Sequence, residues 1–411
     1  MDGALRGKKI LYAASTFGHL RSFHVPYLRA LSGEGADVVA LASGNPKGLP
    51  EGIRYSEAPF TKSFTSAHNF AAAWQVARLL RREHFDLVLA HTSLAAFFVR
   101  LGVMLAGPSV RHRGLRVINT VHGYLFDEAT PTLKRAIMLG AEKITAGVTD
   151  RIVTMNRQDT CIARRYHLCR GEVVQVDGMG VELADGIPTT EERAEARRRL
   201  RIPDNVFVLL YAAEFSKRKN QRMLIEALSR LSKEVVLALP GRGDELEVCR
   251  GLAESLGVAD RVLLPGFVSG GLGDWRAAAD VCVSASRSEG LPFHVIEAMA
   301  SGLPVILSHV KGHEDLVGTI EGTDYQLQTG STRAIGEVED VSSGCPGLLY
   351  PFNDVLAFCR CVEHLRNDPL LRYEMSEAAK KEAQRYALDR VMRRVLSLYL
   401  AESVRGCYPT F

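Results

Sequence analysis

The stretch SRSEGLPFHVIEAMASGLPV, residues 286–305, lies between two short apolar runs. The run before it, DVCVSAS (280–286), and the run after it, PVILSHV (304–310), each have the length and composition of a buried strand. The GLP break between them is followed by an apolar segment and predicts a turn into a helix. A strand, a helix and a second strand in this order predict a parallel sheet that is covered by helices.

Two carboxylates flank the start of this predicted helix, Glu289 before the break and Glu297 on the helix itself. The turn falls at the carboxyl end of a strand, where α/β proteins bind ligands. Pro292 suits the first helical position and Leu291 has no side-chain acceptor, so the first amides stay open for an anion such as a phosphate. Glu289 would accept hydrogen bonds from sugar hydroxyls and Glu297 from a second diol. The alternative is that both glutamates are solvated surface residues.

The same alternation of strands and helices continues along the chain, so the predicted fold class is α/β. The 411 residues fit two domains of about 200 residues each. We expect two doubly wound domains, at 1–182 and 183–385, with a hinge near 180–203. The predicted strands are 9–15, 37–43, 86–92, 116–123, 151–156 and 173–177 in the first domain, and 206–213, 235–241, 261–267, 280–286 and 304–310 in the second.

Composition argues against several classes of protein. A net charge of +4 with 24% charged residues is too balanced for a nucleic-acid-binding protein. The eight cysteines show no Cys-x-x-Cys spacing, so we expect structural thiols in a reducing cytoplasm and no metal site. No apolar run reaches the roughly 18 residues that span a bilayer, and the first one is too short for a signal peptide. The polar segment 317–347 predicts either a β-hairpin insertion or a mobile flap.

The stretch at 286–305 resembles the signature of the retaining glycosyltransferases of family 4. That signature reads EGLP, then a second glutamate eight residues after the first, then EAMA-GLPV. The resemblance resumes at KGHEDLV (311–317) and covers most of the chain. It implies the GT-B fold, in which two Rossmann-like domains face each other across a cleft that holds the nucleotide-sugar. It also implies that the C-terminal helix, at 386–411, crosses back to the first domain.

The resemblance assigns roles to four residues of this stretch. It places Glu289 beside the hydroxyls of the donor sugar and Glu297 beside the hydroxyls of the ribose. The amides near Gly290 and Leu291 then approach the diphosphate or the sugar.

A basic loop, within AAEFSKRKNQRMLIEAL (212–228), follows the first strand of the second domain. A cationic loop between a strand end and a helix suits a diphosphate. Lys219 matches the lysine of the family, whereas Glu214 stands where the family usually has an arginine, so a neighbouring cation would supply the second charge. The candidate donor contacts in this loop are Lys217, Arg218, Lys219 and Asn220. The alternative is an ordinary solvated loop.

In the first domain, TFGHLRSFHVPYLRALSGEGADV (16–38) follows the first strand. It lacks the G-x-G-x-x-G fingerprint, which argues against a dehydrogenase. It resembles the opening of bacterial capsule and exopolysaccharide glycosyltransferases. Gly18 would let a phosphate approach the backbone, and His19 is a candidate acceptor or donor contact. We read His24 as a packed or capping residue.

Two more histidines end predicted strands of this domain. His122 lies in NTVHGYLFDEATP (119–131), which resembles a motif whose histidine faces the donor sugar and the reaction centre. His91 begins HTS (91–93), where Ser93 replaces the proline of the related motif, and it is either an acceptor or donor contact or a structural residue.

The resemblance implies a retaining transferase that moves a hexosyl or N-acetylhexosaminyl group from a nucleotide-sugar, with uracil as the expected base. The expected acceptor is a polyprenyl-diphosphate-linked saccharide or another glycan of bacterial surface polysaccharide synthesis. The expected catalytic residues are His122, Glu289 and Lys219. No Asp-x-Asp pair is placed to hold a metal, so we expect no metal and no cofactor.

Other readings stay open at this point. A GT-B sugar-nucleotide epimerase would use the same fold without an acceptor, and a non-catalytic sugar-nucleotide-binding scaffold would fit the departure at Glu214. The basic clusters RLLRRE (78–83) and RHRGLR (111–116), with the apolar segment 94–107, would let the chain dock on anionic lipid at the inner face of the cell membrane. The alternative is a buried helix with ordinary solvated charges and a cytoplasmic protein.

Overall fold

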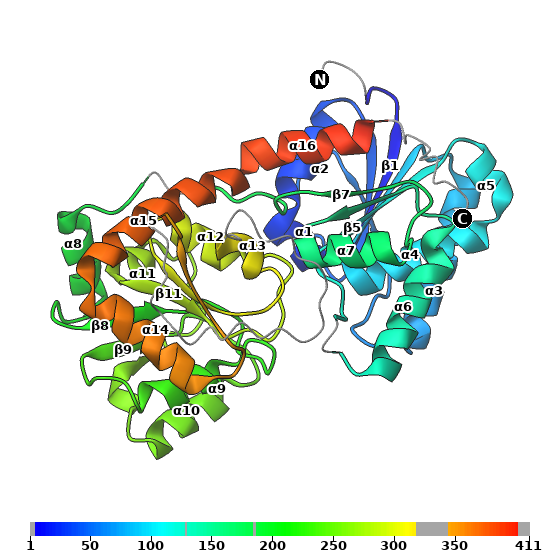
Figure 1. The fold of residues 1–411 in the computed structure, drawn as a ribbon. Helices are drawn as coiled ribbons and strands as arrows, with labels where there is room; N and C mark the ends of the chain where they lie inside the picture. The colour runs from blue at the N-terminus through cyan, green and yellow to red at the C-terminus, as the bar shows by residue number, and fades with distance from the viewer. Residues whose placement is uncertain (1–4, 128–129, 184–185, 318–343, 402–411) are drawn as a thin grey trace. The chain divides into compact units, whose positions relative to one another are not determined.

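The computed structural model describes residues 5–127, 130–183, 186–317 and 344–401 (Figure 1). The chain forms two α/β units. Unit 1 comprises residues 1–180 and 389–411, and unit 2 comprises residues 181–388. The polar segment predicted at 317–347 lies almost wholly outside the described residues.

Unit 1 contains a sheet of seven parallel strands in the order β3-β2-β1-β4-β5-β6-β7. Because β1 pairs with β2 on one side and with β4 on the other, the strand order reverses next to β1. Ligands of doubly wound sheets bind outside the carboxyl ends of the strands at such a reversal. The strands are β1 (Lys9–Thr16), β2 (Asp37–Ser43), β3 (Arg54–Glu57), β4 (Leu87–His91), β5 (Arg116–Val121), β6 (Arg151–Thr154) and β7 (Glu172–Gln175).

Unit 2 contains a sheet of six parallel strands in the order β10-β9-β8-β11-β12-β13. Here the order reverses between β8 and β11, so the loops that follow these two strands lie side by side. The strands are β8 (Phe207–Leu210), β9 (Val235–Ala238), β10 (Val262–Leu263), β11 (Val281–Ser284), β12 (Val305–Ser308) and β13 (Gly347–Tyr350).

Helices connect the strands of both sheets, as Figure 1 shows. Unit 1 has α1 (Phe17–Phe23), α2 (Val25–Gly33), α3 (Ala67–Arg82), α4 (Ser93–Ala106), α5 (Pro108–His112), α6 (Thr132–Ala146), α7 (Arg157–Arg165) and nearly all of α16 (Leu388–Leu400). Unit 2 has α8 (Thr190–Leu200), α9 (Gln221–Leu228), α10 (Leu246–Ser255), α11 (Gly273–Ala278), α12 (Phe293–Ala300), α13 (Glu314–Val317), α14 (Val355–Asn367) and α15 (Pro369–Ala383).

Every predicted strand is present, and the prediction of two doubly wound α/β domains is confirmed. Two strands were not predicted. The sequence RYSE of β3 has no apolar run because β3 is an edge strand whose residues are only partly buried. The strand β13 has only four residues and directly follows the polar segment, so nothing in its pattern separates it from that segment.

The predicted hinge at 180–203 is largely a helix of unit 2. The chain divides between Gly180 and Val181, and α8 begins with a capping box in which Thr189 and Glu192 bond each other's backbone amides. Arg193 and Arg197 of α8 both pair with Asp280, at 2.7 and 2.9 Å. These ion pairs hold the helix against the start of β11, so the segment is part of the second core and not a linker.

The C-terminal helix α16 packs on the sheet of unit 1. The guanidinium of Arg116 donates hydrogen bonds of 2.6 Å to the carbonyl oxygens of Tyr399 and Ala401, and Arg151 donates to Leu398. The last carbonyls of a helix lack partners within the helix, and cations are favoured at its negative end. Two strand-borne arginines therefore fix the end of α16 to β5 and β6.

The apolar helix α4 is buried within unit 1, which corrects the suggestion that segment 94–107 docks on lipid. It packs against α3, β1 and α6. A Cβ on Gly102 would lie 2.7 Å from the carbonyl oxygen of Ala73, so α3 and α4 cross closely at this point. Most of the apolar residues of α4 are buried or partly buried in these contacts, and Met104 is the exposed one, at 38%. Among the described helices, none combines the length and the hydropathy that crossing a bilayer requires.

A buried ion pair joins α4 to α6. The guanidinium of Arg100 is completely buried and contacts both carboxylate oxygens of Glu142, at 2.8 and 3.0 Å. It also donates to the carbonyl oxygen of Ala96.

Replacing Glu142 with Ala is expected to lower the free energy of unfolding by about 3–5 kcal/mol, because Arg100 would keep its charge in the core without a partner. Urea unfolding followed by circular dichroism measures the change. The double variant Arg100→Met/Glu142→Leu should recover most of the loss, because it removes both charges. A loss below about 1 kcal/mol in the single variant, the range of a surface pair, would contradict this role.

Candidate active site

The two sequence-predicted catalytic residues of unit 2 meet at the strand reversal. Lys219 lies in the loop after β8 and Glu289 in the loop after β11, and these strands are neighbours. The Lys219 Nζ donates to Glu289 Oε1 at 2.5 Å, and Arg218 Nη1 donates to Oε2 at 3.1 Å. Ser286 Oγ donates to Oε1 at 2.5 Å. Lys219 and Glu289 are each only 8% exposed, so this is a buried charge cluster and not a solvated turn.

The cluster keeps Glu289 ionised. Burial by itself would raise the pKa of Glu289, but the charges of Lys219 and Arg218 outweigh it and hold the pKa well below its ordinary value. Burial lowers the pKa of Lys219, and the attraction of Glu289 partly offsets this effect. The carboxylate therefore accepts hydrogen bonds at neutral pH but cannot serve as a proton donor.

Two histidines, the half-buried His294 and the buried His313, complete the surroundings of Glu289, and sequence reasoning gave neither a role. The Nδ1 of His313 lies 2.7 Å from the carbonyl oxygen of Ser308. Burial lowers the pKa of His313 to about 4 and lowers the pKa of His294 in the same direction. The Nε2 atoms of both rings are buried and find no hydrogen-bond partner among the described residues. Both lie within the quoted motif, in LPFHV and KGHED, which was the available signal.

The helix after Glu289 begins one residue later than predicted. Pro292 is the N-cap of α12: its ψ of 106° is extended, and its carbonyl oxygen already accepts hydrogen bonds from the first helical turn. No side chain caps the first amides, as the sequence predicted. The Leu291 side chain is buried, and the backbone of Gly290 lies against Gly312, where an added Cβ would be 2.6 Å from the Gly290 carbonyl oxygen.

Glu297 forms an ion pair that the sequence did not indicate. Its Oε2 accepts a hydrogen bond of 3.0 Å from Arg276 of α11, and 35% of the Glu297 side chain is exposed. Burial raises its pKa, and Arg276 opposes this shift. The contact of Glu297 with a ribose stays a prediction.

The basic loop offers two exposed cations. Lys217 and Arg218 are exposed, whereas Lys219 is buried. Asn220 adopts the left-handed conformation, φ +54°, at the N-cap of α9, which asparagine tolerates better than most residues. Its side chain donates to Asn353 at 3.2 Å. The side chain of Glu214 is exposed to solvent and is not part of the buried Lys219–Glu289 ion pair.

A pocket of about 730 Å³ opens beside this loop, at the carboxyl ends of β8, β9 and β10. Gly241 and Gly243 form its floor in conformations with φ of +158° and +152°. A Cβ on Gly241 would lie 1.9 Å from the carbonyl oxygen of Ala213, so only glycine fits. Phe267 is 64% exposed and carries the Arg242 guanidinium 4.8 Å above its ring. Sequence reasoning missed this pocket, although the glycines of PGRGD follow a predicted strand.

Four histidines of unit 1 gather near the carboxyl ends of β1, β4 and β5, which are adjacent strands. His91 ends β4 and its Nδ1 lies 3.2 Å from the Nε2 of His122, which follows β5. His19 lies on α1, its ring 5.3 Å from that of His122. His24 is completely buried, as expected for a packed residue, and its Nδ1 lies 2.7 Å from the hydroxyl of Tyr12.

These imidazoles are neutral at physiological pH. Burial lowers the pKa of His19 to about 4 and that of His91 to about 3. The pKa values of His24 and His122 are lowered for the same reason, because an imidazolium would be stripped of water beside other histidines.

The same residues are the metal-ligand candidates among the described part of the chain. One ring nitrogen from each of His19, His24 and His122 lies within 4.8 Å of the others. Neutral imidazoles are the form that binds metals. The sequence predicts no metal here, and that stays a prediction.

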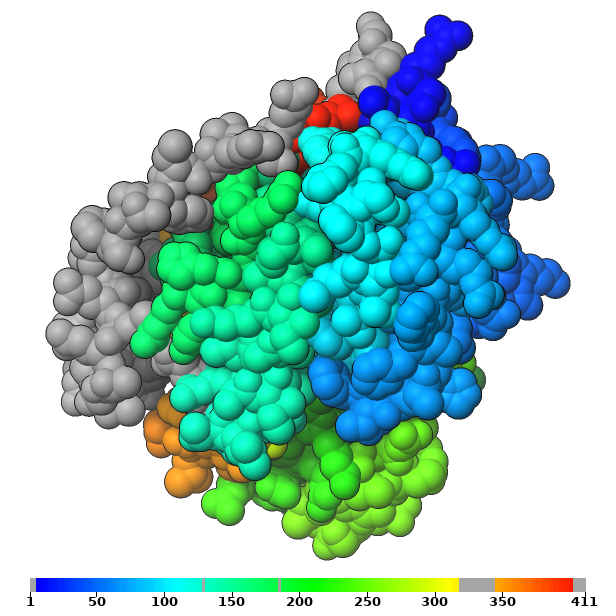
Figure 2. All heavy atoms as spheres, turned by 90° about the vertical axis from the view of Figure 1, so that its right-hand side faces the viewer, coloured from blue at the N-terminus to red at the C-terminus, as the bar shows by residue number. Residues whose placement is uncertain are grey.

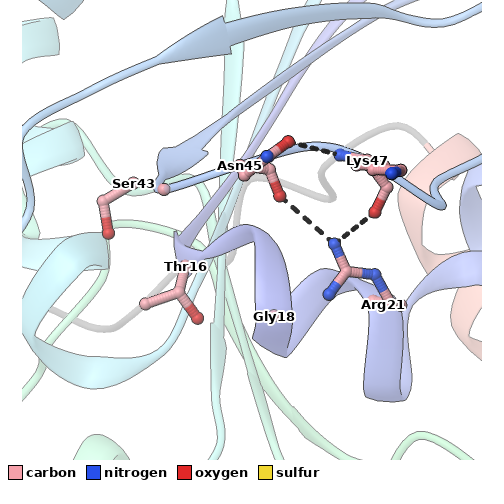
Figure 3. A pocket seen from close by; sticks show the side chains of 7 residues that line it. Thr16, Gly18, Arg21, Ser43, Asn45 and Lys47 are labelled. Carbon is pink, nitrogen blue, oxygen red and sulfur yellow. Dashed lines mark hydrogen bonds between the residues drawn. The ribbon is translucent and has the colours of Figure 1, made fainter.

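A second pocket of unit 1, of about 540 Å³, lies beside Gly18 at the ends of β1 and β2 (Figure 3). The Thr16 hydroxyl accepts a hydrogen bond of 3.0 Å from the amide of His19, and this bond caps the start of α1 at the pocket wall. Across the pocket, Arg21 donates to the carbonyl oxygens of Asn45 and Lys47, at 3.2 and 2.5 Å. Sequence reasoning found Gly18 but missed Arg21, although it lies in the quoted stretch 16–38, and missed Asn45 and Lys47, which lie on the loop after β2.

Comparison with known proteins explains why these residues occur together. Residues 192–382 match the family model "Glycosyl transferases group 1", and residues 27–181 match "Glycosyltransferase Family 4". The two matches together include most of both units. The chain belongs to the family 4 glycosyltransferases.

Two curated relatives of this glycosyltransferase are similar over most of their length. This chain is 28% identical over 398 residues to "Putative glycosyltransferase EpsD" of Bacillus subtilis, and the alignment covers 96% of this chain and 97% of the relative. It is 22% identical over 329 residues to the "UDP-Gal:alpha-D-GlcNAc-diphosphoundecaprenol alpha-1,3-galactosyltransferase" of Escherichia coli, and this alignment covers 79% of this chain and 77% of the relative.

A solved structure shows the same fold. Anabaena HepE, crystallised with UDP and glucose, superposes with a TM-score of 0.71 at 17% identity over 95% of this chain and 99% of HepE. The predicted GT-B fold class is therefore confirmed. The predicted cleft between the two domains stays a prediction.

The buried histidines predict that acid destabilises unit 1. In the unfolded chain His91 binds a proton below about pH 6.5, whereas in the folded chain it stays neutral down to a pKa of about 3. Its contribution to stability is complete above about pH 6.5 and is lost as the pH falls toward 3. At pH 5 this loss amounts to about 2 kcal/mol.

Urea unfolding at pH 7 and pH 5 tests this expectation. In wild type the free energy of unfolding should be lower at pH 5 than at pH 7, and this drop should be about 2 kcal/mol smaller in His91→Asn. The matched control is His112→Asn, because His112 is exposed on α5 of the same unit. An equal pH dependence in wild type and His91→Asn would contradict the assignment.

Proposed function

We propose that this glycosyltransferase moves a hexosyl or N-acetylhexosaminyl group from UDP to a hydroxyl of a lipid-linked saccharide or related glycan, with retention of configuration. The observation that carries the proposal is the ionised Glu289, held by Lys219 and Arg218 at the strand reversal of unit 2. The UDP complex of HepE and the diphosphoundecaprenol acceptor named for the Escherichia coli relative support the donor and the acceptor class.

The donor would lie along the carboxyl edge of the unit 2 sheet. The glycine-floored pocket at β8, β9 and β10 suits a planar base, which would stack against Phe267. The diphosphate would then meet the exposed cations Lys217 and Arg218 and the N-terminal end of α12, which no side chain caps. The sugar would face Glu289, whose carboxylate accepts hydrogen bonds from its hydroxyls.

The proposed chemistry is front-face displacement. The bond from the anomeric carbon to the diphosphate oxygen breaks, the acceptor oxygen bonds to that carbon on the same face, and its proton passes to the departing diphosphate. Lys219 and Arg218 stabilise the charge that develops on the diphosphate. Glu289 stays engaged by Lys219, so its role is to orient the sugar, and no covalent glycosyl intermediate on it is proposed.

On the acceptor side we assign roles to three histidines of unit 1. Neutral His122 would bond the donor sugar or the acceptor hydroxyl, while His91 fixes its ring and His19 contacts the substrate beside Gly18. The reaction as proposed needs no metal and no cofactor. We also propose a place in bacterial surface polysaccharide synthesis at the cytoplasmic face of the membrane, which the diphosphoundecaprenol-linked acceptor named for the Escherichia coli relative supports.

Release of UDP in the presence of an acceptor tests the proposal. Purified protein is incubated with UDP-glucose, UDP-galactose or UDP-N-acetylglucosamine and with N-acetylglucosamine linked to a short polyprenyl diphosphate. Glu289→Gln and Lys219→Ala should each lower turnover by about 10²–10³, because the first weakens the acceptor that orients the sugar hydroxyls and the second removes a cation that stabilises the departing diphosphate. Lys233→Ala, an exposed lysine of unit 2, is the matched control.

Four outcomes of this assay would contradict parts of the proposal. UDP release without acceptor would indicate an epimerase or hydrolase, and its absence with every donor would indicate a binding scaffold. Normal turnover of both variants would refute the site. Loss of turnover in EDTA that added Zn²⁺ or Mg²⁺ restores would refute metal independence and direct attention to His19, His24 and His122.

A further inference from the structure

The surface of unit 1 carries an apolar stripe on α6. Leu133, Ile137 and Ile144 are 76%, 55% and 58% exposed. Spacings of four and seven residues place these three side chains on one face of the helix. Single exposed apolar residues are ordinary, but an ordered row of branched aliphatic side chains is a feature of interaction surfaces.

The neighbouring face of α6 already supplies contacts with the core. Ala141 and Thr145 are buried, and Glu142 forms the ion pair with Arg100. The stripe is therefore not needed to hold α6 in the unit, and its exposure is a property of the folded helix.

A second apolar group lies on α3, with Phe70 46% and Trp74 57% exposed, four residues apart on one face. The ring of Phe70 packs on Phe98 of α4, at 5.2 Å, and α4 packs in turn on α6. Figure 2 shows the face of unit 1 on which α3, in blue, and α6, in turquoise green, both reach the surface.

The charges beside these side chains have one sign. Lys134 and Lys143 are exposed on α6, and Arg78 and Arg82 are exposed on α3. The sequences of the two helices contain a single carboxylate, and this is the buried, paired Glu142. Branched and aromatic apolar side chains flanked by lysine and arginine match the boundary of an anionic bilayer.

We propose that the exposed faces of α3 and α6 form a docking surface for an anionic lipid bilayer, which we call the α3/α6 face. A second copy of the chain fits less well, because a two-fold contact through this face would bring its basic residues against one another. The proposal replaces the basic cluster predicted at 111–116, because Arg111 is bonded to Asp150 at 2.8 Å and Arg116 holds α16.

The docking surface rests on the proposed function, because an acceptor that is linked to a lipid is presented at a membrane. Binding to vesicles is measured without donor or acceptor. Failure to bind vesicles therefore leaves the transferase proposal untouched, and failure of the transferase assay leaves vesicle binding untouched.

Vesicle flotation tests the docking surface. The protein should float with vesicles of phosphatidylcholine containing about one-third phosphatidylglycerol, remain unbound with phosphatidylcholine alone, and dissociate as salt is raised. Leu133→Gln/Ile137→Gln and Lys134→Glu/Lys143→Glu should each weaken binding about tenfold or more. The matched control is Leu370→Gln/Tyr373→Gln on α15 of unit 2, where both side chains are more than 60% exposed, at 68% and 64%.

Intrinsic fluorescence localises the contact independently. The chain has two tryptophans, the exposed Trp74 and Trp275, which is 8% exposed. Anionic vesicles should shift the emission to the blue, and Trp74→Phe should abolish the shift while the protein still floats. Equal flotation of the α3/α6 variants and wild type would overturn the proposal. So would a dimer in sedimentation that the same variants dissociate, with no vesicle binding.

Discussion

Lys219 and Glu289 form an ion pair that is almost completely removed from water. Each charge alone would cost several kcal/mol at this depth, so each residue stabilises the other in its charged form. The pair exists because β8 and β11 are neighbours, which brings two loops 70 residues apart in sequence into contact. Its further bonds to Arg218 and Ser286 fix the carboxylate at the strand reversal, where a parallel sheet leaves its ends open to a ligand.

The two units place different kinds of side chain at the carboxyl ends of their sheets. Unit 2 places fixed charges at the end of its sheet, and unit 1 places imidazoles there whose pKa values burial has lowered. A nucleotide-sugar carries its negative charge on the diphosphate, whereas the sugar and the acceptor present neutral hydroxyls. Cations in unit 2 and neutral hydrogen-bonding rings in unit 1 fit that division, and both follow from which residue types end the strands.

Much of this organisation could be predicted from the sequence, because short apolar runs and the turn at Glu289 are local signals. The strands, the two domains and the loops that carry Lys219, His91 and His122 follow from such signals. Pairing between distant elements does not. Arg276 bonds Glu297 and Tyr12 bonds His24 only because of how the helices and strands pack, which no periodicity encodes. The same holds for α4, whose apolar sequence suits lipid as well as a core, and only its neighbours decide between them.

The central claim is that the carboxyl edge of unit 2 binds a uridine diphosphate donor. Isothermal titration of UDP, compared with ADP and GDP, tests it most directly, using wild type and Phe267→Ala. The account predicts one UDP per chain, weaker binding of the other nucleotides, and a loss of about 1–3 kcal/mol when the exposed ring is removed, the usual size of a base–aromatic stack. Absence of binding, or UDP affinity unchanged by Phe267→Ala, would contradict the placement of the donor.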